Sequence, residues 1–408
     1  MADRPKLYQF TNCRILRDHK LIRSDLWVRN GRILNPKLLF WDEKVQADVR
    51  IDCCNYIISP GFIDVQINGA FGIDFSSPDI DISHGLRIVS KGLLQHGVTA
   101  YCPTIVTSSP QTYKSILPRI KKRPGGSHGA TVLGVHLEGP YINPLKRGAH
   151  ECEMIHSKVE NGLETLLNTY GSLDNVVLIT IAPEIPGILD AVQELAQKNV
   201  VVSLGHSAAT LSQAETAVNR GASFITHLFN AMVPFHHRDP GLIGLIASNN
   251  VPAGKTIYYG VIADGVHIHE CGLRVAHRIN PAGTVLITDA MAAMGLNVKK
   301  YQLGPMVVEI RDGHAYLEST NTLAGSVVTM DSCVKYFRQA SGCTVVETLE
   351  AATLHPALLL GIADSQGTLS FDTNADFTVL DDNLNVMSTW IAGRRVWMHD
   401  DCQMVLTD

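Results

Sequence analysis

The chain has 408 residues, of which 45% are hydrophobic and 18% are charged, and its net charge is −5. This composition excludes a disordered chain, which would lack the apolar surface that offsets the entropy of ordering. The acidic balance argues against non-specific binding to nucleic acid or anionic membranes, and no apolar run reaches the roughly 18 residues of a membrane span.

Both ends of the chain are rich in β-forming residues. Short runs of this kind, separated by turn residues such as Asn30-Gly31, fill the first sixty residues, and similar runs occur at 367–381 and 385–397. We therefore predict one small β-sandwich domain built from both chain ends, residues 1–59 and 364–408.

The middle of the chain, residues 60–363, alternates short apolar runs with stretches of helical spacing. Eight runs have the Val/Ile/Leu-rich character of strands buried on both faces. They lie at 57–67, 98–106, 132–140, 176–184, 200–207, 223–232, 257–267 and 285–291. Eight strand–helix units in series predict an α/β fold, a closed (β/α)8 TIM-type barrel with right-handed crossovers.

The alternative architecture is an open, doubly wound sheet. No glycine-rich phosphate-binding loop follows any of the eight runs, so a nucleotide-binding version of that fold has no support. Two further helical stretches, around 330–340 and 346–360, follow the eighth run and are expected to cover the barrel before the chain returns to the small domain.

Polar residues at the carboxyl ends of the predicted strands are informative, because in a barrel these ends meet on one face, where active sites form. Glu138 ends the third strand, His206 the fifth and His227 the sixth. One carboxylate and two imidazoles suit a catalytic Zn²⁺ or similar ion with a position left open for water. A single histidine is more often a hydrogen-bonded core imidazole, but three candidates at equivalent positions favour a metal site. His136 lies two residues before Glu138, so strand alternation places both on the same face, and His136 is a candidate hydrogen-bonding partner of a metal ligand.

The eighth strand ends in Asp289, opposite the strands that carry the metal candidates. A carboxylate in that position can accept a proton from the attacking water and later deliver it to a leaving nitrogen. The alternative role is an N-cap for a helix that follows.

Two loops at the same mouth carry positive charge. Residues 236–241 read His-His-Arg-Asp-Pro-Gly, and Arg238 beside His237 suits recognition of a phosphate or carboxylate, although a solvated loop explains the pattern equally well. Residues 146–150 add a lysine, an arginine and a histidine. A basic mouth on an acidic protein predicts an anionic substrate.

Several segments, in the same order, carry a family resemblance that covers essentially the whole chain. They are PGFIDVQING, HLEGPYINPLKRGAH, SLGHS, THLFNAM, HHRDPG, ADGVHIH, TDAM and LAGS. Together they resemble the N-acetylglucosamine-6-phosphate deacetylase family of the amidohydrolase superfamily, and its eukaryotic members most. The resemblance implies hydrolysis of N-acetyl-D-glucosamine 6-phosphate to D-glucosamine 6-phosphate and acetate, in amino-sugar catabolism. It also implies one divalent ion per subunit, expected to be Zn²⁺.

The resemblance further implies a role for each matching residue. Glu138, His206 and His227 would hold the metal, Asp289 would be the general base and then the acid, and His150 would polarise the acetamido carbonyl. The substrate contacts implied are Ala149, Asn230, Ala231, His237, Arg238, Asp264, Gly265, Val266, His267, Leu323, Ala324 and Gly325. Backbone groups of Asn230 and Ala231 and the side chains of His237 and Arg238 would meet the phosphate, and His267 the sugar hydroxyls. In this family the neighbouring subunit often supplies the arginine, so a homodimer is expected.

One departure from the superfamily pattern concerns the number of metal ions. Many members carry two histidines on the first barrel strand and a lysine on the fourth, and these hold a second ion. Here Gln66 and Asn68 take the histidine positions, amides are poor ligands for transition metals, and the run 176–184 has no lysine. We therefore predict a mononuclear site.

Two other functions stay open on the same scaffold. A dihydroorotase-like cyclic-amide hydrolase would need the binuclear site, and a catalytically inactive amidohydrolase scaffold would be expected to have lost its metal ligands. We also expect a cytosolic protein, because the nine cysteines form no CxxC pair and the N-terminus has no signal-peptide core.

Overall fold

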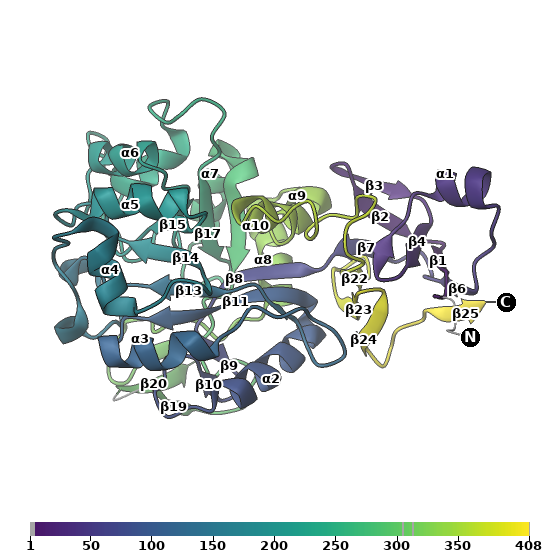
Figure 1. Ribbon diagram of the computed structural model, residues 1–408, viewed down its shortest axis with the longest axis horizontal. Coiled ribbons are helices and arrows are strands. Elements are labelled where there is room, and N and C mark those ends of the chain that lie inside the picture. The colour runs from purple at the N-terminus through teal and green to yellow at the C-terminus, as the bar shows by residue number, and fades with distance from the viewer. Residues whose placement is uncertain (1–4, 304–305, 312–313, 408) are drawn as a thin grey trace.

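A computed structural model describes residues 5–303, 306–311 and 314–407 (Figure 1). Two sheets formed by segments near both chain ends make a small sandwich beside the larger body. One sheet has the order β25 (Val405–Thr407), β6 (Val49–Asp52), β1 (Tyr8–Thr11), β4 (Leu26–Arg29), β5 (Arg32–Ile33). The other has the order β24 (Arg394–Met398), β23 (Val386–Ile391), β22 (Phe377–Leu380), β7 (Ile57–Pro60), β2 (Arg14–Arg17), β3 (Lys20–Arg23).

The sandwich core joins the two ends of the chain through aromatic side chains. Phe10 from β1 packs edge-on against Phe377 and Trp390, with ring centroids 5.2 and 4.9 Å away. Such contacts add to the free energy gained by burying the rings themselves. The predicted β-sandwich is confirmed, whereas the exact domain boundaries stay a prediction. The first sixty residues, predicted to form strands only, also contain a short helical segment made of α1 (Pro36–Leu38) and a π-helical turn (Leu39–Glu43).

The larger body is a barrel of eight parallel strands. In order around the barrel they are β8 (Phe62–Ile67), β11 (Val98–Val106), β13 (Val135–Glu138), β14 (Val176–Ile181), β15 (Val201–Leu204), β16 (Phe224–Ile225), β17 (Tyr258–Ile262) and β18 (Thr284–Ile287). A parallel bridge between Ile67 and Ala290 joins the first strand to the last. The predicted barrel is therefore confirmed. The apolar run at 57–67 is divided, because β7 belongs to the sandwich and β8 to the barrel.

Helices cover the outside of the barrel where apolar residues recur at helical spacing (Figure 1). They are α2 (Ile82–Leu93), α3 (Pro110–Ile116), α4 (Gly162–Tyr170), α5 (Ile188–Gln197), α6 (Leu211–Asn219) and α7 (Glu270–Ile279). Between β16 and β17 a 3-10 helical segment (Gly241–Ala247) takes the place of an α-helix. In α2, for example, Leu86, Val89 and Leu93 form the buried face. Asp81 begins this helix by accepting a hydrogen bond from the His84 amide.

The chain departs from the expected path after the eighth strand. A three-stranded antiparallel sheet, β19 (Lys300–Leu303), β20 (Met306–Arg311) and β21 (His314–Leu317), comes before the two expected helical stretches. Those stretches form α8 (Met330–Ser341), α9 (Val345–Glu350) and α10 (Leu354–Leu359). The remaining short strands are β9 (Gly69–Ala70), β10 (Ile73–Asp74) and β12 (Thr131–Val132).

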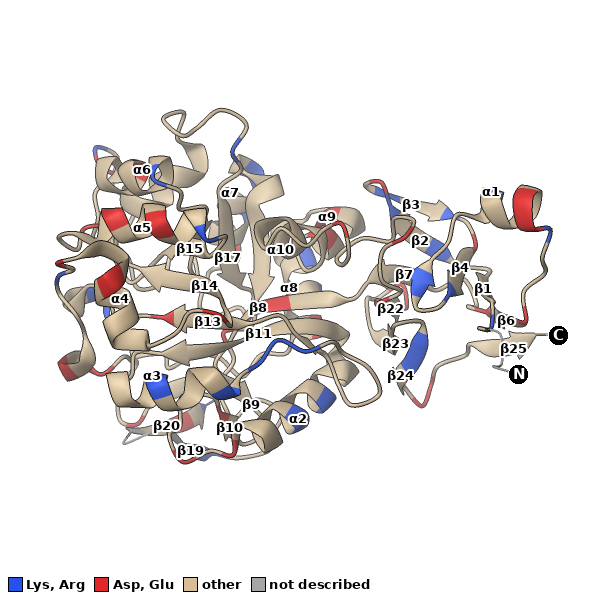
Figure 2. Cartoon of the chain, viewed as in Figure 1, with Lys and Arg blue, Asp and Glu red and all other residues tan. Residues whose placement is uncertain are grey.

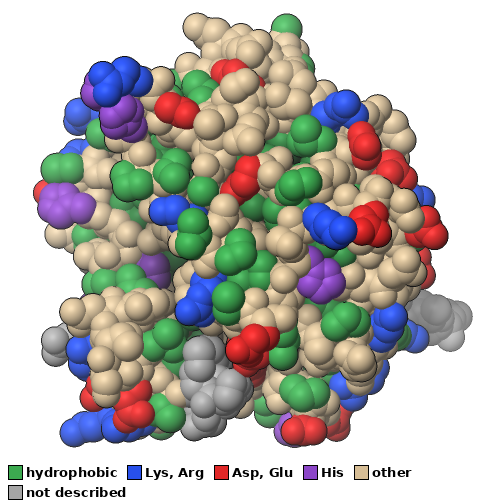
Figure 3. All heavy atoms as spheres, turned by 90° about the vertical axis from the view of Figure 1, so that its left-hand side faces the viewer, with side chains coloured by type: hydrophobic (Ala, Val, Ile, Leu, Met, Phe, Trp, Pro, Cys, Tyr) green, Lys and Arg blue, Asp and Glu red, His purple; other side chains and the backbone are tan. Residues whose placement is uncertain are grey.

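Charged side chains of both signs are interspersed over the outer helices and over the face turned to the viewer in the space-filling picture (Figures 2 and 3). Among the described residues, none of the helices combines the length and the apolar character that a membrane span requires.

Candidate active site

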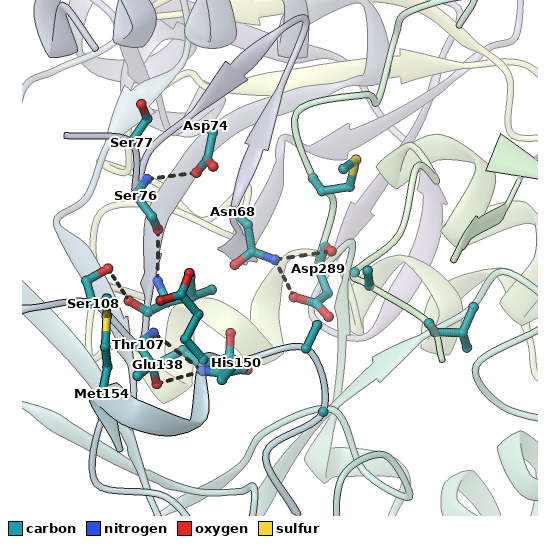
Figure 4. A pocket seen from close by; sticks show the side chains of 18 of the residues that line it. Asn68, Asp74, Ser76, Ser77, Thr107, Ser108, Glu138, His150, Met154 and Asp289 are labelled. Atoms are coloured by element: carbon teal, nitrogen blue, oxygen red, sulfur yellow. Dashed lines mark hydrogen bonds between the residues drawn. The ribbon is translucent and has the colours of Figure 1, made fainter. Parts of the chain in front are cut away.

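A cavity of ≈ 910 Å³ opens at the carboxyl ends of the barrel strands (Figure 4). Its lining includes the polar side chains that follow four of these strands: Glu138 on β13, His206 after β15, His227 after β16 and Asp289 after β18. All four residues are at least nine-tenths buried. Parallel strands in a barrel all end on one face, and this arrangement brings side chains distant in sequence together.

Glu138, His206 and His227 form a tight triangle. Oε1 of Glu138 lies 3.0 Å from Nε2 of His206 and 3.0 Å from Nε2 of His227, and the two Nε2 atoms are 3.0 Å apart. On the other side of the His206 ring, Nδ1 lies 2.9 Å from the carbonyl oxygen of Lys146. A carbonyl only accepts, so Nδ1 carries the proton and Nε2 of a neutral His206 presents a lone pair to the cluster.

This donor set fits a divalent cation. One carboxylate oxygen and two imidazole nitrogens converge on one point. Protons could turn some of these three close contacts into hydrogen bonds, but not all of them at once, whereas one cation between the three atoms satisfies them all. The carbonyl that fixes the His206 ring is the kind of outer partner that metal-binding histidines usually have. His227 has no such partner among the described residues, because its buried Nδ1 forms no hydrogen bond there. Two histidines and one carboxylate leave a further position for water or substrate.

The backbone at this site is strained. The φ angles of His206, His227 and Asp289 are 48°, 28° and 49°, in the left-handed region that residues with a Cβ seldom adopt. Strain of this kind costs on the order of 1–3 kcal/mol at each residue and clusters at functional sites, where the surrounding structure enforces it. At all three positions the chain turns sharply just after a barrel strand.

Gln66 and Asn68 hold the carboxylates in place. The side-chain nitrogen of Gln66 donates to Oε1 of Glu138 at 3.0 Å and lies 3.2 Å from Oδ1 of Asp289. The side-chain nitrogen of Asn68 donates to the same Oδ1 at 2.8 Å. The two side chains thus serve as hydrogen-bond donors to Glu138 and Asp289.

Asp289 is buried beside a second carboxylate. Burial, and then the charge of Glu138, raises the pKa of Asp289 to about 6. A carboxyl group with a raised pKa is well matched to accepting and returning a proton near neutral pH. The alternative role of a helix N-cap does not apply, since the described residues that follow form turns and no helix begins there.

His150 lines the cavity beside the cluster, with its ring centroid 4.5 Å from that of His206. Its Nδ1 lies 2.7 Å from the Thr107 hydroxyl and receives the Thr107 amide at 3.4 Å (Figure 4). Burial lowers the pKa of His150 to about 3, so the ring is neutral near physiological pH.

His267 also lines the cavity, and Asp264 positions it. Nδ1 of His267 lies 2.7 Å from Oδ2 of Asp264, while Oδ1 of Asp264 accepts the amides of Val266 and His267. Asp264, Gly265 and Val266 are not among the residues lining the cavity. Their contribution is to shape the turn that presents His267.

The remaining predicted contacts fall into two groups. Those that line the cavity are Ala149, Asn230, Ala231, Leu323, Ala324 and Gly325. His237 and Arg238 are exposed on a loop outside the cavity lining of this chain, and Phe235 on the same loop is 63% exposed.

One further buried histidine and one further cluster of titratable groups are held by hydrogen bonds to their neighbours. His136 is a buried core imidazole, with its nitrogens 3.1 Å from the Val65 carbonyl oxygen and 2.8 Å from the Thr180 hydroxyl. On α7–α9, His277 lies near Cys343 and Glu347. The Cys343 thiol already pairs with Thr348, and Glu347 caps α9 through Thr344.

One part of the cavity wall, which follows the second barrel strand, was not predicted from the sequence. Thr107 and Ser108, together with Ser76 and Met154, line the cavity (Figure 4). Polar residues directly after the run 98–106 were the available signal, because the same rule identified residues after the other strands.

A model of the amidohydrolase family matches residues 57–396 of the chain. The N-acetylglucosamine-6-phosphate deacetylase of Danio rerio is 55% identical to it over 97% of this chain and 98% of that protein. The enzyme of the same name from Homo sapiens is 53% identical over 97% of both.

A solved structure of an enzyme with the same name is also similar to this chain, at lower sequence identity. An aspartate-to-alanine mutant of N-acetyl-D-glucosamine-6-phosphate deacetylase from Mycobacterium smegmatis, in complex with N-acetyl-D-glucosamine-6-phosphate, has a TM-score of 0.80 and 28% identity. The match covers 97% of this chain and 100% of that one.

Proposed function

The chain belongs to the amidohydrolase family, and on that premise we infer that it hydrolyses N-acetyl-D-glucosamine 6-phosphate to D-glucosamine 6-phosphate and acetate. The bond broken is a linear amide C–N bond, and the reaction belongs to amino-sugar catabolism. The structural observation that carries this inference is the convergence of Glu138, His206 and His227 beside Asp289 in one cavity. Relatives more than half identical over nearly their whole length bear the name of this enzyme.

We propose that Glu138, His206 and His227 hold one divalent ion, Zn²⁺, in each subunit. When bound, such an ion lowers the pKa of a coordinated water towards 7 and polarises a carbonyl oxygen. The two amides of Gln66 and Asn68 bind carboxylates and leave no histidine pair for a second ion, which supports a mononuclear site.

Asp289 is proposed as the group that moves the proton. Its carboxylate takes a proton from the water that attacks the acetamido carbon and delivers that proton to the amine nitrogen as the C–N bond breaks. Asn68 and Gln66 fix the carboxylate through Oδ1. Its second oxygen, Oδ2, receives no hydrogen bond from the described residues, and we assign the proton transfer to that atom.

His150 and His267 are proposed to bind the neutral parts of the substrate. His150 donates to the acetamido oxygen, where negative charge develops during the attack. His267, held by Asp264, binds sugar hydroxyls. Backbone groups of Ala149, Asn230, Ala231 and residues 323–325 complete the wall around the sugar and its phosphate.

We propose that Arg238 and His237 clamp the phosphate from the neighbouring subunit of a homodimer. Both residues are exposed and lie outside the cavity lining of their own chain, next to the exposed ring of Phe235. An arginine–phosphate pair uses binding energy remote from the reacting bond to position the sugar.

All nine cysteines are free thiols, which supports a cytosolic location.

The deciding experiment combines metal analysis with an acetate-release assay. About one ion per chain, activity lost on chelation and activity regained with Zn²⁺ are the expected results. Two ions per chain would favour a binuclear cyclic-amide hydrolase, and a metal-free chain without activity would indicate an inactive scaffold. No acetate from the phosphorylated sugar with a full metal site would refute the proposed substrate.

A further inference from the structure

Thr107 places two hydrogen-bonding groups on one nitrogen of His150. The residue directly follows β11, at the carboxyl end of the second barrel strand, and is buried. Its hydroxyl lies 2.7 Å from Nδ1 of His150, and its backbone amide lies 3.4 Å from the same atom. Figure 4 shows both residues at the wall of the cavity.

The backbone amide shows which nitrogen of His150 carries the proton. An N–H group can only donate, so Nδ1 of His150 must accept and cannot be protonated. The Thr107 hydroxyl, which can rotate, then donates to the same lone pair. Its contact of 2.7 Å is much shorter than the 3.4 Å contact of the amide, so the hydroxyl supplies most of the interaction that holds this tautomer. The ring is therefore neutral, and its one N–H group is at Nε2.

The Nε2 side of the ring is the side without partners. Within the described part of the chain, Nε2 of His150 forms no hydrogen bond, while Nδ1 is engaged by Thr107 and the ring lines the cavity. Neutral histidine in the other tautomer would present a lone pair at Nε2. A lone pair would repel a carbonyl oxygen, whereas an N–H group stabilises the negative charge that grows on it during attack.

The fold makes room for the Thr107 hydroxyl at a glycine. Gly139, directly after Glu138, has φ +83°, and a Cβ added there would clash with the Thr107 Oγ1. A side chain at this position would displace the hydroxyl from its contact with His150. The turn that ends β13 thus serves both Glu138 and the Thr107–His150 pair.

We propose that Thr107 is a positioning residue that fixes His150 in the tautomer with its proton on Nε2, so that the imidazole donates to the acetamido oxygen of the substrate. The inference rests on the proposed deacetylation and adds to it a residue that acts through another. The outer partners of catalytic histidines select a tautomer in this manner in other enzymes.

The test compares Thr107→Val, Thr107→Ser and a matched control, Thr378→Val, in the metal-loaded enzyme. Thr378 on β22 is a buried threonine outside the cavity lining, and its hydroxyl donates to the Ser388 carbonyl oxygen. Valine keeps the shape of threonine and loses only the hydroxyl donor. We expect Thr107→Val to lower kcat by roughly 10-fold with KM nearly unchanged, since the interaction strengthens in the transition state. Thr107→Ser should restore kcat, and the Thr378→Val control should match wild type.

A double-mutant cycle separates positioning from a general structural role. In a His150→Ala background, Thr107→Val should change kcat by less than about twofold, because the group that it positions is gone. Metal content and thermal melting establish that each variant is folded. Equal losses from Thr107→Val with and without His150, or a kcat within about twofold of wild type for Thr107→Val alone, would overturn the proposal. A wild-type enzyme that releases no acetate would refute the deacetylase function itself, which is a different outcome.

Discussion

Asn68 donates a hydrogen bond of 2.8 Å from its side-chain amide to Oδ1 of Asp289, across the seam where the first and last barrel strands meet. The same Oδ1 lies 3.2 Å from the Gln66 amide. One carboxylate oxygen is thereby fixed by two neutral donors, and the other is left for proton transfer. The two amides also hold Glu138 and Asp289 in place, although both are buried acids close enough for the charge of Glu138 to raise the pKa of Asp289.

Removing the Asn68 donor should misorient Asp289 and weaken catalysis. A hydrogen bond to a charged group contributes about 1.5–3 kcal/mol, so Asn68→Ala should lower kcat/KM by roughly 10- to 100-fold while the metal content stays at the wild-type level. Steady-state acetate release and elemental analysis measure the two quantities. Asn219→Ala, at an exposed asparagine on α6, is the matched control. A loss of metal from Asn68→Ala would mean that the amide supports the metal ligands more than it supports Asp289.

Asp289→Asn is the direct test of the proton carrier. The amide retains the shape of the carboxylate but cannot accept a proton, and general acid–base catalysis contributes about 10²–10⁴-fold to rates. We expect a folded variant that keeps its metal and loses at least about 100-fold in kcat. Turnover near the wild-type rate would remove Asp289 from the reaction.

Arg238→Ala should act mainly on binding of the phosphate. Because the guanidinium is remote from the reacting bond, the variant should have a raised KM for N-acetyl-D-glucosamine 6-phosphate. Wild-type activity on the unphosphorylated sugar should be much lower. If the two sugars were equally good substrates, the phosphate clamp would be wrong.

A complementation experiment distinguishes an arginine that acts across subunits from one that acts within its own chain. Each single variant, Arg238→Ala or Asp289→Asn, is impaired in both sites of a homodimer. In a mixed dimer with the clamp in trans, one site combines an intact Asp289 with an intact Arg238 from the partner. Co-expression should then restore about a quarter of the wild-type activity, as random pairing in a two-fold dimer dictates. An arginine that acts in its own chain would restore none.

Much of the fold was predictable because barrel strands buried on both faces leave an apolar run in the sequence. The eight runs became β8, β11 and β13–β18, and the aromatic residues at the chain ends met in one sandwich core. The sheet β19–β21 was missed although its segment offers a signal, since Asp312-Gly313 stands between two β-forming runs and this dipeptide is typical of β-hairpin turns. It hydrogen-bonds within itself and depends little on the barrel pattern.

The site was predictable to the extent that strand ends determine it. The rule that carboxyl ends of barrel strands converge brought Glu138, His206, His227 and Asp289 together, and their roles stay predictions. The Gln66 contacts span 72 and 223 residues of sequence, and no local pattern encodes such distant partners. The conformation of the loop that carries Arg238 could not be predicted from the sequence either, because a loop that follows a short strand can adopt many conformations.

The buried contact between Asp331 and His96 should make stability depend on pH. Asp331, in the first turn of α8, lies 2.9 Å from Nδ1 of His96, which precedes β11. Although burial opposes ionisation, the hydrogen bond and charge of His96 outweigh it and lower the pKa of Asp331 to about 2. The folded pKa is below the ordinary value of about 3.9, so the stabilisation is present above pH ~4 and is lost as the pH falls towards 2.

Asp331→Asn should therefore reduce the free energy of unfolding by about 2 kcal/mol at pH 6, with Tm lower by roughly 2–4 °C. The difference from wild type should shrink as the pH is lowered from 4 to 3, because Asp331 takes up a proton in the unfolded chain, where its pKa is about 3.9, while it stays mostly ionised in the folded chain. Thermal melting of both proteins over this range measures the effect. Asp190→Asn, whose side chain is 74% exposed in its contact with Arg220, is the control and should change Tm little at any pH. A difference that stays constant from pH 6 to pH 3 would show that Asp331 acts through packing alone.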